Sequence, residues 1–386
     1  MTVVAGLVGL RPAPERVAKV SCPPYDVIKE GTPLEAKLQA EDDSLFHVTL
    51  GDAPAAALTS LRARNALIDD NEPAFYVYEQ TWELPTPGQR TGVFLACEVT
   101  DYAEHQVIRH EKTFDAKVKG RIALAESTGH TFGPVFLLTR ASLKGAFASV
   151  KEEAPLYDFV SDFGPGTELT GIASKVWRVP EESEAGRTIQ AAIGEHPLYI
   201  ADGHHRYHAA LRNEQTHTLA YVTEEAEILA YDRVVNGTVP FAEVREKLDL
   251  KPVEAFATPG KHAFCLHSRE GTWLLEAKEV PEDVVGRLDC SILERELYPH
   301  LGLSHDQIVD PAHFDYYPES ALDEMKAQVA SGKYELAVAL HPVSIGELMA
   351  VADAGLEDPE IVMPEKSTFF APKILSGLFV YRHARR

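Results

Sequence analysis

The feature that most constrains the fold of this chain is an alternation of strand and helix patterns between residues 175 and 213. Lys175–Val179 and Leu198–Ala201 have the apolar composition of strands, whereas Glu181–Gly194 and Gly203–Asn213 have the pattern of helices. Strands that alternate with helices are typical of α/β proteins, because the helices cover the apolar faces of a sheet. We therefore expect a mixed α/β (α+β) fold.

The second strand runs into the sequence Asp202-Gly203-His204-His205-Arg206. Gly203 permits the positive φ of a tight turn, and a helix that starts there presents unpaired N–H groups and the positive end of its dipole. Such a helix terminus binds anions, and the planar guanidinium of Arg206 matches phosphate oxygens. We expect Gly203 and Arg206 to bind a phosphate-bearing cofactor. Asp202, His204 and His205 are the expected catalytic residues of this turn.

Two other interpretations of the turn remain open. In the first, Asp202 only caps the helix and the histidines lie on the surface. In the second, the turn holds a metal ion, since His204 and His208 are spaced i, i+4 and Asp202 and His205 lie beside them. No Glu stands between the two histidines in the manner of zinc proteases, so we assign no metal ligand.

Two segments concentrate positive charge in a chain whose formal net charge is -22. In the first, 105–121, Lys112 could contact phosphate, and Glu111 could act as a catalytic general base or bind a metal ion. The second, 365–373, has two hydroxyl groups between two lysines. Either segment could instead be a solvated surface. The expected cofactor-binding residues of the two segments are His110, Lys112, Thr113, Lys366, Ser367, Thr368 and Lys373.

The composition limits the partners of the chain. Acidic residues outnumber basic ones by 59 to 37, and this disfavours nucleic acid, whose binding needs Lys and Arg at the phosphates. No stretch approaches the roughly 20 apolar residues of a membrane span. The four cysteines form no C-x-x-C pair, as fits a reducing compartment. We expect a cytoplasmic protein with a small phosphate-bearing ligand and no nucleic-acid or membrane partner; its oligomeric state remains open.

The length of 386 residues is large for a single core, so we expect several packed regions. Changes in pattern suggest boundaries near residues 100 and 240. We predict an N-terminal α/β region (1–100), a phosphate-binding core (101–240) and a C-terminal α/β region (241–386). The C-terminal region would contribute the Lys-Ser-Thr loop to the site.

Several motifs, taken together, resemble a bacterial family catalogued as domain of unknown function 1015. They are Pro23-Pro24-Tyr25-Asp26-Val27-Ile28, Arg109-His110-Glu111-Lys112-Thr113, Tyr199–Arg206, Met363-Pro364-Glu365-Lys366-Ser367-Thr368, Pro372-Lys373 and Ser376-Gly377-Leu378-Phe379. Their order and spread cover nearly all of the chain, which is therefore identified as a member of this family. The Asp-Gly-His-His-Arg turn is also similar to the phosphate-binding turn of the ParB and sulfiredoxin superfamily, which includes archaeal free serine kinases. This resemblance implies a ParB/sulfiredoxin-like core and kinase-like phosphotransfer at residues 202–206.

We therefore predict a small-molecule kinase that moves a phosphoryl group between ATP or ADP, with Mg²⁺, and the hydroxyl of a metabolite. In this interpretation Asp202 or Glu111 binds Mg²⁺ or deprotonates the acceptor, and His204 or His205 donates to the phosphate. A non-catalytic nucleotide sensor that uses the same turn is the first alternative. A metal-dependent hydrolase that uses His204, His205 and His208 is the second.

Overall fold

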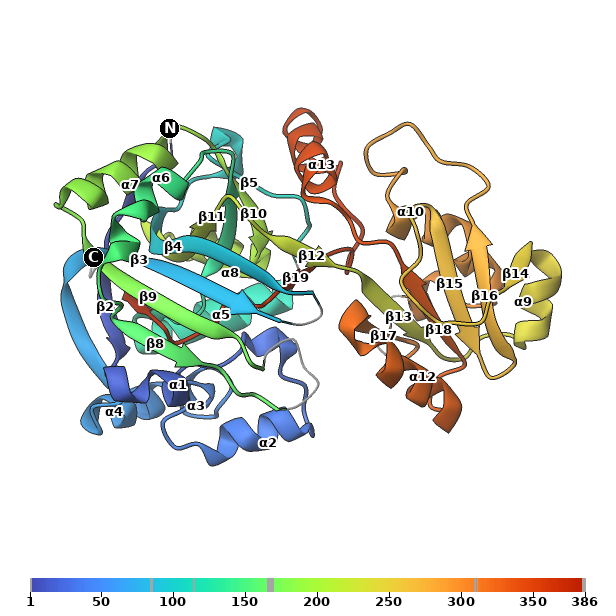
Figure 1. Cartoon of the computed structure of the whole chain (residues 1–386), viewed down its shortest axis with the longest axis horizontal. Helices are drawn as coiled ribbons and strands as arrows, with labels where there is room; N and C mark the ends of the chain where they lie inside the picture. The colour runs from blue at the N-terminus through green and yellow to red at the C-terminus, as the bar shows by residue number, and fades with distance from the viewer. Residues whose placement is uncertain are drawn as a thin grey trace. The chain divides into compact units, whose positions relative to one another are not determined.

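The computed structural model describes residues 2–83, 86–113, 115–164, 170–308, 310 and 312–383. It divides into two units (Figure 1): unit 1 is Met1–Ala226 with Pro372–Arg386, and unit 2 is Glu227–Ala371. Unit 2 is thus an insertion, after which the chain returns to unit 1. These boundaries differ from those predicted near residues 100 and 240, because strands from both sides of residue 100 pair in one sheet and the first strand of unit 2 begins at Glu227.

In the part of unit 1 that the structure describes, one mixed sheet contains twelve strands (Figure 1). In chain order they are β1 (Val4–Ala5), β2 (Leu7–Pro12), β3 (Leu67–Trp82), β4 (Gly88–Glu98), β5 (Val107–Ile108), β6 (His130–Thr131), β7 (Val135–Thr139), β8 (Tyr157–Val160), β9 (Ala173–Pro180), β10 (Leu198–Asp202), β11 (His217–Thr223) and β20 (Val380–Arg382). The main path is β5-β10-β7-β11-β4-β3-β2-β20-β6; β1 joins β4, and β9 joins β3 and β8. β10 runs parallel to β5 and antiparallel to β7.

The described part of unit 1 also contains α-helices. They are α1 (Val17–Val20), α2 (Pro33–Ala40), α3 (Phe46–Thr49), α4 (Pro54–Ala63), α5 (Asp115–Thr128), α6 (Lys144–Ala148), α7 (Glu184–Gly194) and α8 (His204–Arg212). The predicted strand, helix, strand, helix order is confirmed as β9, α7, β10 and α8, and the predicted mixed α/β fold with it. α7 begins after Ser183, whose hydroxyl accepts a hydrogen bond from the Gly186 N–H.

The two faces of the sheet have different cores, because side chains alternate along each strand. Val77 and Leu95 belong to a hydrophobic cluster that also contains Ile189 of α7. The neighbouring positions Tyr78 and Phe94 belong instead to a group of aromatic rings, whose centroids lie 5.5 Å apart. We call the second face, which carries Tyr78 and Phe94, the aromatic face.

The C-terminal segment, residues 372–383, completes unit 1. β20 pairs with β2 on one side and with β6 on the other. Just before β20, Phe379 packs on the aromatic face, with its ring centroid 3.8 Å from that of Tyr76 and 5.1 Å from that of Phe94. The sheet of unit 1 is thus assembled from segments that are far apart in the sequence.

Unit 2 has its own sheet, with the order β14-β16-β15-β18-β13-β17. Its strands are β13 (Tyr231–Val235), β14 (Leu250–Pro252), β15 (Ala263–Ser268), β16 (Gly271–Glu276), β17 (Phe314–Pro318) and β18 (Leu336–Leu340). A separate pair, β12 (Glu227–Leu229) and β19 (Phe369–Ala371), joins the two ends of the unit. The helices are α9 (Phe241–Lys247), α10 (Asp289–Glu296), α11 (His305–Ile308), α12 (Leu322–Ser331) and α13 (Ile345–Glu357). Across the described ranges of both units, every helix is too short or too polar to cross a bilayer.

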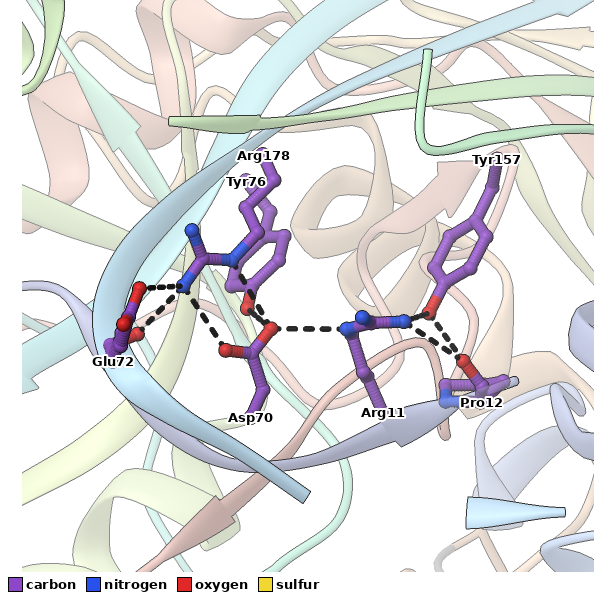
Figure 2. A network of polar contacts seen from close by, with 7 residues as sticks. All are labelled: Arg11, Pro12, Asp70, Glu72, Tyr76, Tyr157 and Arg178. Atoms are coloured by element: carbon purple, nitrogen blue, oxygen red, sulfur yellow. Dashed lines mark hydrogen bonds and ion pairs between the residues drawn. The ribbon is translucent and has the colours of Figure 1, made fainter. Parts of the chain in front are cut away.

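Asp70 of β3 is the centre of a polar network (Figure 2) that connects β2, β3, β8 and β9. Its carboxylate accepts hydrogen bonds from Arg11 at 2.9 Å, from Tyr76 at 2.6 Å and from both Nε and Nη2 of Arg178, at 3.2 and 3.0 Å. Tyr157 extends the network by donating to the Pro12 carbonyl at 2.6 Å. Burial would raise the pKa of the Asp70 carboxyl, but the bonds from Arg178, Tyr76 and Arg11 outweigh burial and lower it.

We expect the variant Asp70→Asn to lower the free energy of unfolding by about 2 kcal/mol at pH 7, because it removes charge-assisted hydrogen bonds. A carboxyl whose pKa is lowered by folding stabilises the protein at pH values above the pKa that the carboxyl has in the unfolded state. The difference in the free energy of unfolding between wild type and Asp70→Asn should therefore decrease as the pH falls below 3.8, the ordinary pKa of this carboxyl. Urea unfolding at a series of pH values from 7 to 3 measures this gap.

Asp158→Asn is the matched control, because Asp158 is 61% exposed and lies 3.9 Å from Lys175. It should change the free energy of unfolding by less than about 0.5 kcal/mol. Equal stability of Asp70→Asn and wild type at pH 7, or a gap that does not depend on pH, would contradict the role given to this network.

Candidate functional site

The predicted strand-to-helix turn forms where β10 ends and α8 begins. Leu198–Ala201 are buried in the sheet, and Gly203 has a φ of +100°, a left-handed conformation that favours glycine. α8 then begins at His204, with Arg206 in its first turn. Because the first N–H groups of a helix have no carbonyl partner within the helix, this end of α8 favours an anion.

The Asp202 carboxylate joins this turn to the C-terminal segment. Its Oδ1 accepts a hydrogen bond from Arg206 Nη2 at 3.0 Å, and its Oδ2 accepts one from Lys373 Nζ at 2.9 Å. The exposed fractions of the three side chains are 20% for Asp202, 10% for Arg206 and 9% for Lys373. Asp26 also acts electrostatically on Arg206 and on Arg121, so three cations face two carboxylates here. The remaining positive charge attracts an anion.

The ionisation of Asp202 follows from these neighbours. Burial alone would raise the pKa of its carboxyl, but the Lys373 ammonium and the Arg206 guanidinium outweigh burial and hold that pKa well below its ordinary value. Asp202 is therefore a permanent carboxylate at neutral pH. Such a group orients the two cations and is a poor acceptor for a proton.

The guanidinium of Arg206 is held from several sides. Its Nη1 donates a hydrogen bond to the carbonyl oxygen of Pro134. A Cβ atom at Gly203 would lie 2.9 Å from Arg206 Nε, and one at Gly133 would lie 3.3 Å from Nη1. The two glycines thus leave the space that the guanidinium occupies.

A hollow adjoins Arg206, with about 580 Å³ of empty space including its open mouth. A second guanidinium, that of Arg121 on α5, also lines it, and the Arg121 Cζ lies 4.0 Å from the centre of the Tyr25 ring. The other lining residues are mostly small or apolar: Thr49, Ile122, Leu124, Ala125, His130, Thr131, Phe132, Gly133, Ala209, Ala210, Gln215, Thr218 and Ser376. The hollow thus combines two guanidinium groups with an apolar wall, which suits a molecule that has an anionic part and an apolar part.

A second set of predicted residues, His110, Glu111 and His204, also comes together. His204 Nε2 accepts a hydrogen bond from the backbone N–H of His110 at 3.4 Å, and the two rings meet edge to face with centroids 4.4 Å apart. Glu111 places one carboxylate oxygen 3.6 Å from His204 Nδ1 and the other 3.8 Å from His110 Nε2.

The two imidazoles of this set are neutral at pH 7. Burial lowers the pKa of His110 to about 4 and that of His204 well below its ordinary value. Because His204 Nε2 accepts from a backbone N–H, its proton lies on Nδ1, the atom that faces Glu111. Glu111 itself is 27% exposed, so among these three side chains it is the one most open to solvent.

The other residues predicted for the site lie in α8, in the loop after β5 and in unit 2. His205 is half-buried in the first turn of α8, and Lys112 and Thr113 lie in the loop after β5, with Lys112 exposed. That these three residues contact a ligand stays a prediction.

Lys366, Ser367 and Thr368 belong to unit 2, whereas Lys373 belongs to unit 1. Within unit 2, Lys366 Nζ lies 5.7 Å from the centre of the Tyr231 ring, and the Ser367 hydroxyl donates to the Pro364 carbonyl. The structure thus brings Lys373 to Asp202, and the role of the Lys-Ser-Thr loop in binding stays a prediction.

The histidines of the metal-binding interpretation have separate partners. His204 faces Glu111 and His110, whereas the His208 ring stacks on that of Tyr102 with centroids 6.0 Å apart. Within the ranges that the structure describes, no group of three or more His, Cys, Asp or Glu side chains is arranged to hold a metal ion.

Of the residues that line the hollow, Arg206 alone was predicted for the site. Tyr25 and Arg121 do have a sequence signal, since Tyr25 lies in the Pro-Pro-Tyr-Asp motif and Arg121 ends the first cationic segment. Ser376 also lies in one of the quoted motifs, Ser376-Gly377-Leu378-Phe379, whereas Gly133 lies in none of them. The place of Gly133 beside the guanidinium follows only from the fold, which also brings Ser376 to the wall of the hollow.

Comparisons with known proteins give one family and several distant structures. A model of the family described as protein of unknown function (DUF1015) matches residues 4–291. No curated protein matches the chain.

Among solved structures, a variant of free serine kinase in complex with AMP is 13% identical with a TM-score of 0.39, and covers 74% of this chain and 92% of that one. Another variant of free serine kinase, in complex with ADP, is 12% identical with a TM-score of 0.38, and covers 77% and 96%. SbnI with a C-terminal truncation from Staphylococcus aureus is 12% identical with a TM-score of 0.33, and covers 73% and 85%. Likenesses of this size carry no argument about activity.

The geometry of the turn predicts that Gly203→Ala displaces the Arg206 guanidinium and strains the backbone. A left-handed conformation costs a residue with a Cβ atom about 1–2 kcal/mol, and the free energy of unfolding should fall by at least that amount. Gly120→Ala is the control, because no atom lies near a Cβ at this position in the interior of α5. It should stabilise the protein by up to about 1 kcal/mol. Urea unfolding measures both variants, and a Gly203→Ala protein as stable as wild type would contradict this geometry.

Proposed function

Since the chain belongs to the family of proteins of unknown function DUF1015, as its motifs predicted, we propose its function from its own site: it is a phosphotransferase that moves a phosphoryl group between a nucleotide and the hydroxyl of a small metabolite. One observation carries the proposal. Arg206 and Lys373 share the Asp202 carboxylate at the N-terminus of α8, and Arg206 also lines a hollow that contains Arg121.

We choose phosphoryl transfer because this reaction requires of the protein mainly that it position the reactants and neutralise the charge of the phosphates. The N–H groups at the start of α8 and the guanidinium groups of Arg206 and Arg121 are suited to phosphate oxygens. The apolar wall of the hollow is suited to the base of the nucleotide. Lys373 adds a further cation, which Asp202 holds at a fixed place.

In the proposed reaction, the oxygen of the acceptor hydroxyl forms a bond to the terminal phosphorus of the nucleotide. The bond from that phosphorus to the bridging oxygen of the nucleotide breaks, and the shortened nucleotide leaves. Glu111 takes the proton of the hydroxyl, because it is partly exposed and lies beside neutral imidazoles, whereas Asp202 is bound to two cations. His204 lies beside Glu111, with its protonated Nδ1 3.6 Å from a Glu111 carboxylate oxygen.

Magnesium commonly accompanies nucleotide phosphates, but the described side chains do not form a ready site for it. Both oxygens of Asp202 already accept hydrogen bonds from cations, and Glu111 lies beside two imidazoles. A site for Mg²⁺ usually combines one or two free carboxylates with the substrate phosphates. We therefore assign no step of the reaction to the metal.

The proposal predicts turnover that depends on Arg206. Wild-type protein incubated with ATP or ADP, Mg²⁺ and pooled hydroxylated metabolites should give a phosphorylated product, detected by mass spectrometry. Arg206→Ala should lower the rate at least about 100-fold, since one donor to a developing phosphate charge contributes that much. Arg212→Ala on the same helix is the control, because Arg212 pairs with the exposed Asp115 outside the hollow. It should keep the wild-type rate.

Two outcomes would reject the proposed activity. One is the absence of product across the whole pool, and the other is an Arg206→Ala protein that is folded and as active as wild type. If ADP raises the melting temperature of the wild type without any turnover, the site binds a nucleotide as a sensor instead.

The role of Glu111 gives a second prediction for the same assay. Glu111→Gln should lower kcat about 100-fold or more, because a general base contributes 10²–10⁴ to the rate. The affinity for ADP, measured by calorimetry, should change little, since Glu111 is assigned to the acceptor and not to the nucleotide. A kcat equal to that of wild type would show that another group takes the proton.

A further inference from the structure

The segment between β19 and β20 forms no regular strand, so its carbonyl groups need partners outside a ladder. Two of these carbonyls, those of Pro372 and Lys373, lie on either side of the Lys373 Cα. The Pro372 carbonyl accepts a hydrogen bond from Arg90 Nη2 at 2.6 Å, and the Lys373 carbonyl accepts one from Gln80 Nε2 at 3.2 Å. Arg90 Nη2 also donates to Gln80 Oε1 at 2.6 Å, so the two side chains act as one unit.

Arg90 is an unusual residue to find in this place. It is only 1% exposed, and Gln80 is fully buried. The Arg90 guanidinium lies on the aromatic face of the sheet, with its Cζ 4.9 Å from the ring centre of Phe136 and 5.9 Å from that of Tyr221. Burying a guanidinium is costly unless hydrogen bonds and aromatic faces compensate for the lost water. The Pro372 carbonyl is one of these compensating partners, so the cation and the returning chain depend on each other.

Arg90 and Gln80, which we call the clamp, are connected to the site through a single residue, Lys373. The backbone carbonyl of Lys373 is held by Gln80, and its side-chain ammonium lies 2.9 Å from Asp202. A long lysine side chain is flexible, and fixing it in one position costs conformational entropy. A backbone that is already fixed reduces the number of positions that the ammonium can reach.

We infer that Arg90 and Gln80 are positioning residues, which clamp the backbone at Pro372 and Lys373 so that the Lys373 ammonium stays at Asp202 to meet the phosphate of the ligand. The part of this inference that concerns the ligand rests on the proposed function. The part that concerns the place of Lys373 does not, and it can be measured without any ligand.

The first experiment measures the reactivity of individual lysines toward an amine-acylating ester, by peptide mass spectrometry. Lys373 is 9% exposed and ion-paired, so in wild type it should react slowly. In Arg90→Met and in Gln80→Leu its rate should rise about tenfold, the effect of losing roughly 1.4 kcal/mol of protection. Lys151, which is 31% exposed and paired with Glu79 in the same unit, is the control and should keep its wild-type rate.

Unchanged protection of Lys373 in both variants would overturn the inference. If Lys373 and Lys151 both become reactive in Arg90→Met, that variant has unfolded. The reactivity of Lys373 in Gln80→Leu then tests the inference. Exposure of Lys373 alone in Gln80→Leu supports the clamp, and protection of Lys373 in that variant rejects it.

The second experiment is a double-mutant cycle of ADP affinity by calorimetry. Lys373→Met and Arg90→Met should each weaken binding about tenfold, and the double variant should bind no more weakly than Lys373→Met alone. Additive losses would show that Arg90 acts on binding without Lys373, and would reject the inference. If Lys373 becomes reactive in the clamp variants while Lys373→Met binds ADP like wild type, the clamp stands and the phosphate role proposed for Lys373 fails.

Discussion

The Asp202 carboxylate, shared between Arg206 and Lys373, is the interaction on which the arrangement of the site depends. Asp202 and Lys373 are 171 positions apart in the sequence. One partner lies on the helix that follows β10, and the other lies on the segment that returns after the whole of unit 2. The site is therefore complete only when the C-terminal segment has taken its place beside the sheet of unit 1.

Two other charged groups of unit 1, the partly buried Asp70 and the buried Arg90, also have local partners. Asp70 accepts bonds from two arginines and a tyrosine, whereas Arg90 relies on carbonyl and amide oxygens and on aromatic faces. Buried ions contribute little to stability unless their hydrogen bonds are satisfied, so these groups act mainly by fixing one arrangement of strands and segments. Asp70 does so for the strands around β3, and Arg90 does so for the chain that carries Lys373.

The sequence predicted the parts of this fold that are local. β9, α7, β10 and α8 follow from periodicity, and the position of the turn at Gly203 follows from the need for a positive φ. The family was also predicted correctly from motifs. The division into units was not, because a strand pattern does not reveal which distant strand it pairs with, and nothing in 366–373 marks the unit boundary that separates Lys366 from Lys373. The likeness of the core to the ParB and sulfiredoxin superfamily stays a prediction.

The most direct test of the central claim is a crystal structure of the protein with ADP bound. The account predicts phosphate oxygens within hydrogen-bond distance of the Arg206 guanidinium and of the first N–H groups of α8, with Lys373 still at Asp202. An ADP molecule bound elsewhere, with Arg206 contacting only Pro134 and Asp202, would contradict it.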